Sequence, residues 1–106
     1  MTQFDDREKA YEKEFARNEE FDFKVMARRN KLLGLWAAAK MALADAAADA
    51  YAAQVIASDF EEVGDEDVYR KVKADLDESK ADVSEHQLRR EMEDLLLTAR
   101  EQMSKG

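Results

Sequence analysis

The side chains that could act as catalysts are few and lie apart in the chain. The single histidine, His86, falls near the expected start of the last helix, and no serine or cysteine nucleophile has an evident place beside it. Gly34 and Gly64 stand alone, so the sequence lacks the glycine-rich loop that holds a phosphate. The chain has no cysteine, which excludes thiolate chemistry and thiolate metal sites. We therefore expect no catalytic residue and no enzyme activity.

The acidic run DFEEVGDEDV, residues 59–68, carries the ligand type that calcium prefers. Its single glycine and the order of its carboxylates do not match an EF-hand loop, and acidic residues at a helix start interact favourably with the helix dipole. The sequence thus predicts no metal and no cofactor.

Asp59, within this run, falls inside the apolar stripe of the helix expected before it. A carboxylate that faces a core must be paired or hydrogen-bonded. We expect a structural buried acid whose donors are the first amides of the next helix, Arg28 or Arg29. The alternative is that Asp59 lies beyond the packed region.

In ARRNKLLGLW, residues 27–36, three cations precede the only tryptophan. Arg28, Arg29 and Lys31 beside Trp36 could contact an adenine nucleotide weakly, or an acidic protein surface. The alternative is a core tryptophan surrounded by solvated cations, which the sequence favours.

The segment FDDREKAYEKEFARNEE, residues 4–20, combines high charge with three aromatic residues. Eleven of the sixteen residues from Asp5 to Glu20 are charged. Phe4, Tyr11 and Phe15 fall within about 40° of one another on a helix, which is too thin a stripe to join a core. Pairs at i,i+4 could hold a solvated helix, but they do not explain three aromatic residues on one face.

We interpret this segment as a partner-binding arm that is mobile or only partly helical in the free protein. Its aromatic face would enter an apolar groove, and its cations would meet acidic rims. Homodimerisation through the stripe is the nearest alternative. The residues expected to bind the partner are Phe4, Arg7, Lys9, Tyr11, Lys13, Phe15 and Arg17.

Composition sets the fold class and excludes several kinds of partner. The chain has 106 residues, no proline, 45% hydrophobic residues and a net charge of −8. Helix-forming residues dominate, so one all-α domain is expected. The negative charge argues against nucleic acid, and no apolar stretch is long enough for membrane insertion. These features predict a cytoplasmic protein that is a monomer when free.

Apolar stripes and caps predict four helices. The first runs from Thr2 to about Leu43, and the second runs from about Asp45 to Glu62, with Gly64 as its C-terminal cap. Asp65 caps the start of the third helix, and the fourth begins at the capping box formed by Ser84 and Gln87 and ends near Met103. Short connections favour an antiparallel four-helix bundle over residues 21–106, with residues 1–20 projecting as the arm. Gly34 indicates close helix packing or a bend. The expected core consists of Val25, Leu32, Trp36, Tyr51, Val55, Ile56, Val68, Val72, Leu76, Leu88, Met92 and Leu95.

Three segments together resemble a known family. They are FDDREKAYEKEFA, ARRNKLLGLWAA and DFEEVGDEDVYRKV, spread over residues 4–72. The resemblance is to the zeta subunit of alphaproteobacterial F-type ATP synthases, and AKMALADAAADA is the segment that matches least well.

The resemblance implies a natural inhibitor of ATP hydrolysis, peripherally associated with the membrane-bound synthase. Its N-terminal segment would enter the catalytic head between alpha and beta subunits, reach the gamma subunit and block rotation in the hydrolytic direction. Two alternatives stay open from the residues themselves: a helical protein that senses adenine nucleotides, and a self-associating interaction protein.

Overall fold

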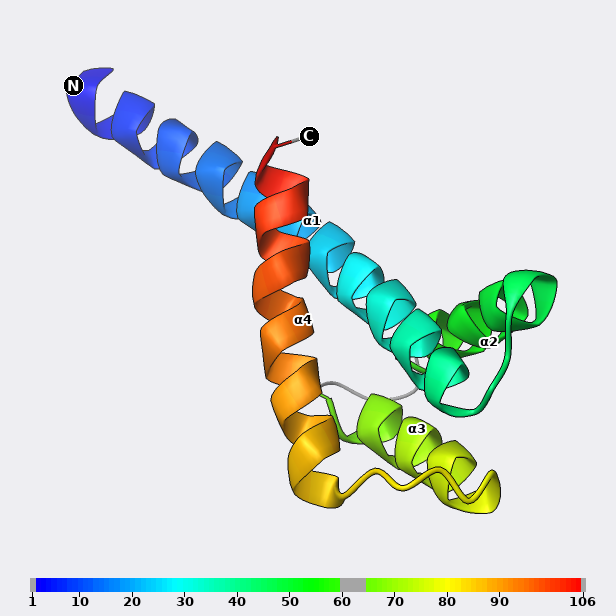
Figure 1. Ribbon diagram of the computed structural model, residues 1–106. Helices are drawn as coiled ribbons and strands as arrows, with labels where there is room; N and C mark the ends of the chain where they lie inside the picture. Colours follow the sequence, from blue (N-terminus) through cyan, green and yellow to red (C-terminus); the bar gives the residue numbers. More distant parts are fainter. Residues whose placement is uncertain (1, 60–64, 106) are drawn as a thin grey trace.

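The computed structural model is all-helical over the residues that it describes, which are 2–59 and 65–105 (Figure 1). Side chains are described for residues 19–59 and 65–105. The four helices are α1 (Thr2–Lys40), α2 (Asp45–Ser58), α3 (Glu66–Glu78) and α4 (Glu85–Lys105). The predicted all-α, four-helix fold is confirmed.

α1 dominates the shape of the molecule. Its 39 residues span about 58 Å at about 1.5 Å per residue, close to the longest dimension of 64 Å. Both α2 and α4 pack on its C-terminal part, whereas its N-terminal turns extend past the other three helices (Figure 1). The first part of the long helix therefore projects, as the sequence predicts.

Burial along the described part of α1 begins at Val25. Glu19 and Glu20 are exposed, Phe21 is half-buried, and residues 22–24 are exposed again. The C-terminal part then buries Val25, Leu33, Ala37 and Ala38 almost completely.

Gly34 marks the closest approach of α1 and α2. A Cβ atom on Gly34 would lie 2.6 Å from Ala52 Cα and 3.3 Å from Val55 Cγ2. No side chain fits between the two backbones, so the close packing expected at Gly34 is present.

This approach sets which face of α1 enters the core. Of the expected core residues, Val25, Tyr51, Val55, Val68, Val72, Leu76, Leu88 and Met92 are buried. The expectation was wrong for four residues, because Leu32, Trp36, Ile56 and Leu95 are only half-buried. With Gly34 against Ala52, the neighbouring Leu33 and Ala37 face the core, and Leu32 and Trp36 lie at its edge.

Two helices end in left-handed residues that are not glycine. After α1, Leu43 N–H donates to Ala38 O at 2.8 Å, and Ala42 has a φ of 62°. After α3, Ala81 N–H donates to Leu76 O at 2.9 Å, and Lys80 has a φ of 60°. Both ends are Schellman motifs.

The other helix ends correct parts of the sequence prediction. α2 stops at Ser58, earlier than the expected Glu62, and the predicted Gly64 cap lies outside the described residues. Asp65 occupies the N-cap position of α3 but makes no side-chain cap hydrogen bond. The cap at Ser84 is confirmed, since Gln87 N–H donates to Ser84 Oγ at 3.1 Å.

Replacing Gly34 with alanine should lower the free energy of unfolding by about 1–3 kcal/mol, because the new Cβ meets the Ala52 backbone. Helix propensity alone would raise the free energy of unfolding by up to about 1 kcal/mol, so the sign of the measured change shows whether close packing or propensity dominates. Urea unfolding followed by circular dichroism measures it. Ala53→Gly, at an exposed α2 position, is the control for propensity, and a stabilised Gly34→Ala variant would contradict the close packing.

Candidate functional site

The residues predicted to bind a partner all belong to the N-terminal part of α1. Phe4, Arg7, Lys9, Tyr11, Lys13, Phe15 and Arg17 have side chains outside the described part of the structure. α1 is continuous from Thr2 to Lys40, so these positions belong to the same helix as the buried residues of the bundle.

The structure separates the four residues proposed as a nucleotide or acidic-surface contact. Arg29 is only 1% exposed, Arg28 is half-buried, and Lys31 is exposed. Trp36 packs against the core, with Lys40 Nζ 5.6 Å from its ring centroid. The four side chains do not converge: Trp36 lies at the edge of the core, and only Lys31 of the three cations is fully exposed.

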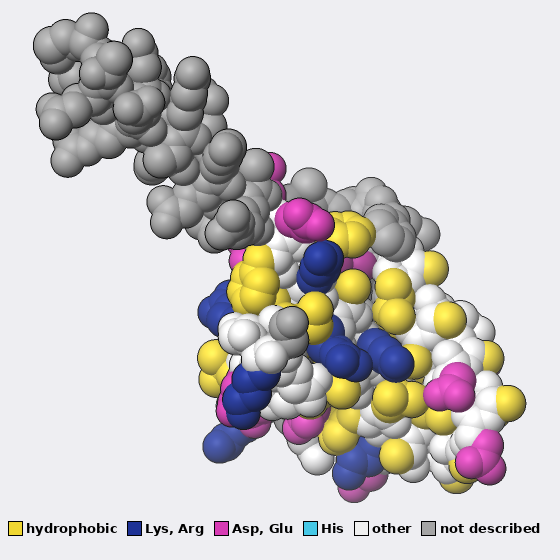
Figure 2. Space-filling model, turned by 90° about the horizontal axis from the view of Figure 1, so that it is seen from above, with side chains coloured by type: hydrophobic (Ala, Val, Ile, Leu, Met, Phe, Trp, Pro, Cys, Tyr) yellow, Lys and Arg dark blue, Asp and Glu magenta, His cyan; other side chains and the backbone are white. Residues whose placement is uncertain are grey.

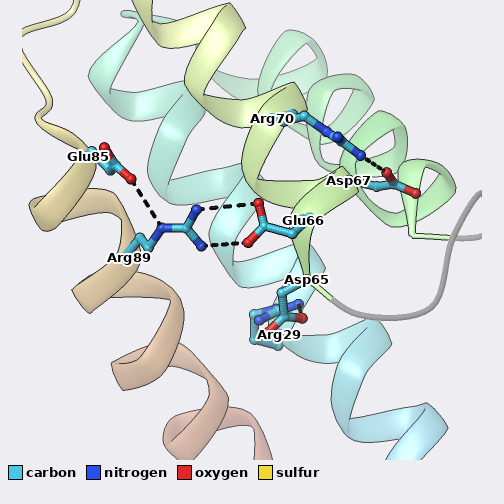
Figure 3. Close-up of polar contacts among 7 residues, drawn as sticks. All are labelled: Arg29, Asp65, Glu66, Asp67, Arg70, Glu85 and Arg89. Carbon is cyan, nitrogen blue, oxygen red and sulfur yellow. Dashed lines mark hydrogen bonds and ion pairs between the residues drawn. The ribbon is translucent and has the colours of Figure 1, made fainter.

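Arg29 links α1 to the start of α3 (Figure 3). Its Nη2 donates to Asp65 Oδ1 at 2.8 Å, and its Nε donates to Asn30 Oδ1 at 2.8 Å. The guanidinium is buried, while the Asp65 side chain is 46% exposed. This ion pair explains why Asp65 makes no cap hydrogen bond, since its carboxylate serves the buried cation.

Arg89 makes the corresponding link from α4 to α3. Its Nη1 and Nη2 donate to the two carboxylate oxygens of Glu66 at 3.0 and 3.4 Å, and its Nε lies 3.6 Å from Glu85 Oε1 (Figure 3). The guanidinium also lies 3.8 Å from the ring centroid of Tyr69, a cation–π distance. The first turn of α3 is therefore held from both sides.

A hollow of about 120 Å³ separates these two arginines. Its acidic and basic side chains are balanced, and both guanidinium groups already have carboxylate partners. The hollow thus offers no unpaired cation to an anionic ligand. It is lined by Arg29, Asp65, Arg89, Met92, Glu93 and Leu96.

Asp59 has a different neighbour from those expected. Arg29 donates to Asp65 instead, and no described hydrogen bond joins Asp59 to Arg28 or Arg29, so that part of the prediction is wrong. Asp59 is half-buried beside Asn30 in a hollow of about 30 Å³ between α1 and α2. Asn30 Nδ2 has no hydrogen-bond partner among the described residues.

Burial raises the pKa of Asp59 above its usual 3.8. The Asn30 amide and the Arg29 charge oppose this rise, whereas the carboxylates of Asp65 and Asp67 add to it. Asp59 is thus a half-buried acid whose charged form is disfavoured by burial, and it forms no ion pair with a described cation.

A further polar link, between α2 and α3, gave no recognisable signal in the sequence. Tyr51 Oη donates to Asp75 Oδ2 at 2.8 Å, and Lys71 Nζ lies 3.0 Å from the same oxygen. Burial, followed by the Asp75 hydrogen bond and charge, raises the pKa of Tyr51 well above its usual value. An aromatic residue in an apolar stripe predicts packing, but not the carboxylate that meets its hydroxyl.

Over the described ranges, no group of three or more histidine, cysteine, aspartate or glutamate residues could hold a metal ion. In the same ranges, no helix is both long and apolar enough to cross a membrane.

Comparison with known proteins identifies the family. The pattern of the family described as ATPase inhibitor subunit zeta matches residues 1–102. The chain belongs to this zeta family. A structure titled "Solution NMR structure of the protein" is 46% identical, covers 78% of this chain and 94% of its own, and superposes with a TM-score of 0.71. No curated protein matches.

Membership in the zeta family makes the chain an inhibitory, regulatory subunit of an ATPase. The zeta match extends from the projecting part of α1 through almost all of α4. The family resemblance noted in the sequence is confirmed.

Removing either partner of the Arg29–Asp65 pair should have unequal effects. Asp65→Ala leaves a buried guanidinium without its carboxylate and should cost about 3 kcal/mol, whereas Arg29→Met leaves a carboxylate that water can reach and should cost about 1 kcal/mol. In the Arg29→Met background, Asp65→Ala should cost about 1 kcal/mol or less. Urea unfolding of the four chains completes this cycle, and equal effects of the two single changes would contradict a buried cation.

Asp59→Asn should stabilise the fold at neutral pH. Because the folded state holds the Asp59 proton more tightly than the unfolded chain, the charged form costs stability once the pH rises through the unfolded and then the folded pKa. The gain from Asp59→Asn should vanish below the usual pKa and level off above the raised one. Unfolding measured from pH 3 to pH 8 tests this, with Asp49→Asn on exposed α2 as control. A gain that does not depend on pH would contradict it.

Proposed function

We propose that this chain inhibits ATP hydrolysis by the F-type ATP synthase by inserting the N-terminal part of α1 into the catalytic head. The segment enters between alpha and beta subunits, reaches the gamma subunit and blocks rotation in the hydrolytic direction. The observation that carries the proposal is the extension of α1 beyond the three helices that cover its other half (Figure 1). Family membership supports the inhibitory role.

The composition of residues 1–20 suits a binding segment. On a helix, the spacing of Phe4, Tyr11 and Phe15 gives one aromatic face, and burial of each ring contributes about 1.5–3 kcal/mol before ordering costs. Surrounding cations direct the segment to acidic rims, which affects the association rate and orientation more than affinity.

The bundle gives the inserted segment an anchor that stays outside the groove. Beyond the long axis, the molecule measures 24 by 21 Å, about twice the width of a single helix with its side chains. A groove that accepts one helix therefore excludes the bundle. The chain acts as a monomer, in the cytoplasm, at the periphery of the membrane-bound enzyme.

Nucleotide sensing finds less support. Arg29 is committed to Asp65, and neither described hollow is lined by Arg28, Lys31 or Trp36. A phosphate needs several convergent donors. Arg28 and Lys31 are only two, and Trp36 does not join them because it packs against the core.

Two variants test the proposal: deletion of residues 2–20, and the triple change Phe4→Ala, Tyr11→Ala and Phe15→Ala. Both should keep the bundle folded by circular dichroism, and both should lose most inhibition of ATP hydrolysis by isolated synthase heads. Two acidic residues on the opposite face of the same segment, changed as Asp6→Asn and Glu20→Gln, provide the control and should retain inhibition. Full inhibition by the deletion variant would place the active surface on the bundle.

A further inference from the structure

Cations recur along one face of α1 from the arm into the bundle. Their successive spacings are 4, 4, 7, 4 and 3 residues, which keep them on the same side of a helix. On a continuous helix the row is about 33 Å long. We call this row the cationic ridge; its residues are Lys9, Lys13, Arg17, Lys24, Arg28 and Lys31.

The described half of the ridge faces away from the packed helices. α1 turns Gly34 toward α2 and Arg29 toward the hollow that α4 lines. Lys31, in contrast, is exposed, the Lys24 side chain is 58% exposed, and Arg28 is half-buried. The bundle thus leaves this part of the ridge open to a partner.

The three ridge cations with described side chains, Lys24, Arg28 and Lys31, have few partners among the described residues. Neither Arg28 nor Lys31 forms an ion pair with a described residue. Lys24 lies 3.4 Å from Glu20, an exposed i,i+4 pair of the kind that contributes about 0.3–0.5 kcal/mol. A partner carboxylate could therefore replace or add to these interactions at small cost.

A row of cations is unusual in a chain whose net charge is negative. The chain has 25 acidic and 17 basic side chains, yet six basic residues share this row. Figure 2 shows the molecule from above: Lys and Arg side chains lie in the middle of this face and also at its edges, interspersed with Asp and Glu. The net negative charge of the chain repels polyanions such as nucleic acid and anionic membranes. A local row of cations can still pair with a few carboxylates, so an acidic protein surface is the favoured partner of the ridge.

We infer that the cationic ridge is a docking surface for an acidic protein surface, continuous from the arm to the bundle. This inference rests on the proposed function. The aromatic face of the arm meets one wall of the site between the two subunits, and the acidic surface is the wall on the opposite side of α1, which the ridge faces. Arg28 and Lys31 then contact this wall while the arm enters, so the bundle takes part in recognition and does not serve only as an anchor. Such contacts accelerate association by electrostatic steering.

The test is the association rate of full-length chains with isolated synthase heads, taken from the onset of inhibition at low and high salt. Arg28→Glu with Lys31→Glu should slow association at least about tenfold at low salt, and the difference should shrink as salt rises. The neutral pair Arg28→Gln with Lys31→Gln should fall in between. Circular dichroism and urea unfolding confirm that each variant is folded.

Arg90→Glu with Lys105→Glu is the matched control. Both residues are exposed on α4, and each double reversal makes the net charge of −8 more negative by four units. The control should associate at close to the wild-type rate.

A ridge variant as fast as this control would overturn the inference. The proposed function would still hold in that case, provided that the wild-type chain inhibits and the aromatic triple variant does not. A wild-type chain that fails to inhibit would contradict both the proposed function and the ridge inference. A different outcome is that the wild-type chain co-sediments with phosphatidylglycerol vesicles while the ridge variant does not. This result would show that the ridge binds an anionic membrane, and it would also overturn the inference.

Discussion

A 39-residue helix can bury only the part that its shorter neighbours reach. α2, α3 and α4 have 14, 13 and 21 residues, so each is much shorter than α1. They gather on its C-terminal half, where Gly34 lets α2 approach closely and where Val25 and Leu33 bury completely. The N-terminal half has too few apolar residues to attract a fifth helix. The division of α1 into a packed and a projecting part follows from these lengths and compositions.

The polar links matter because the short helices bury little surface. α3 has only 13 residues, and its apolar stripe is supplemented at the first turn by Arg29–Asp65 and Arg89–Glu66. Tyr51 joins α2 to Asp75 of the same helix. Each of these links connects a different neighbour to α3, so together they fix its position against α1, α2 and α4. The bundle therefore fixes the C-terminal half of α1 in place.

The sequence predicted the elements better than it predicted their rotation or their polar partners. Local signals such as the Ser84 cap and the isolated Gly34 were correctly interpreted, because each acts within one turn or through one backbone position. The rotation of α1 is set by the close packing of Gly34 on Ala52, a residue of another helix. The sequence of α1 alone does not reveal this contact, and Leu32 and Trp36 were therefore wrongly placed in the core.

The donors of Asp59 were also wrongly assigned. The charge of Arg29 acts on Asp59, but its hydrogen bond goes to Asp65, and only the spatial arrangement of α2 and α3 decides which carboxylate it meets. The helix ends at Ala42 and Lys80 gave no signal, since glycine usually marks them. The arm residues were chosen from the charge content of residues 4–20 and the spacing of three aromatic residues, and their partner-binding roles stay predictions.

Hydrogen exchange of the 106-residue chain, alone and bound to isolated synthase heads, distinguishes binding through the arm from binding through the bundle. Residues 4–17 should exchange quickly in the free chain and become strongly protected on binding, while the buried positions of α2, α3 and α4 keep their protection unchanged. Protection that grows on α2 and α3 while residues 4–17 continue to exchange quickly would contradict binding through the arm.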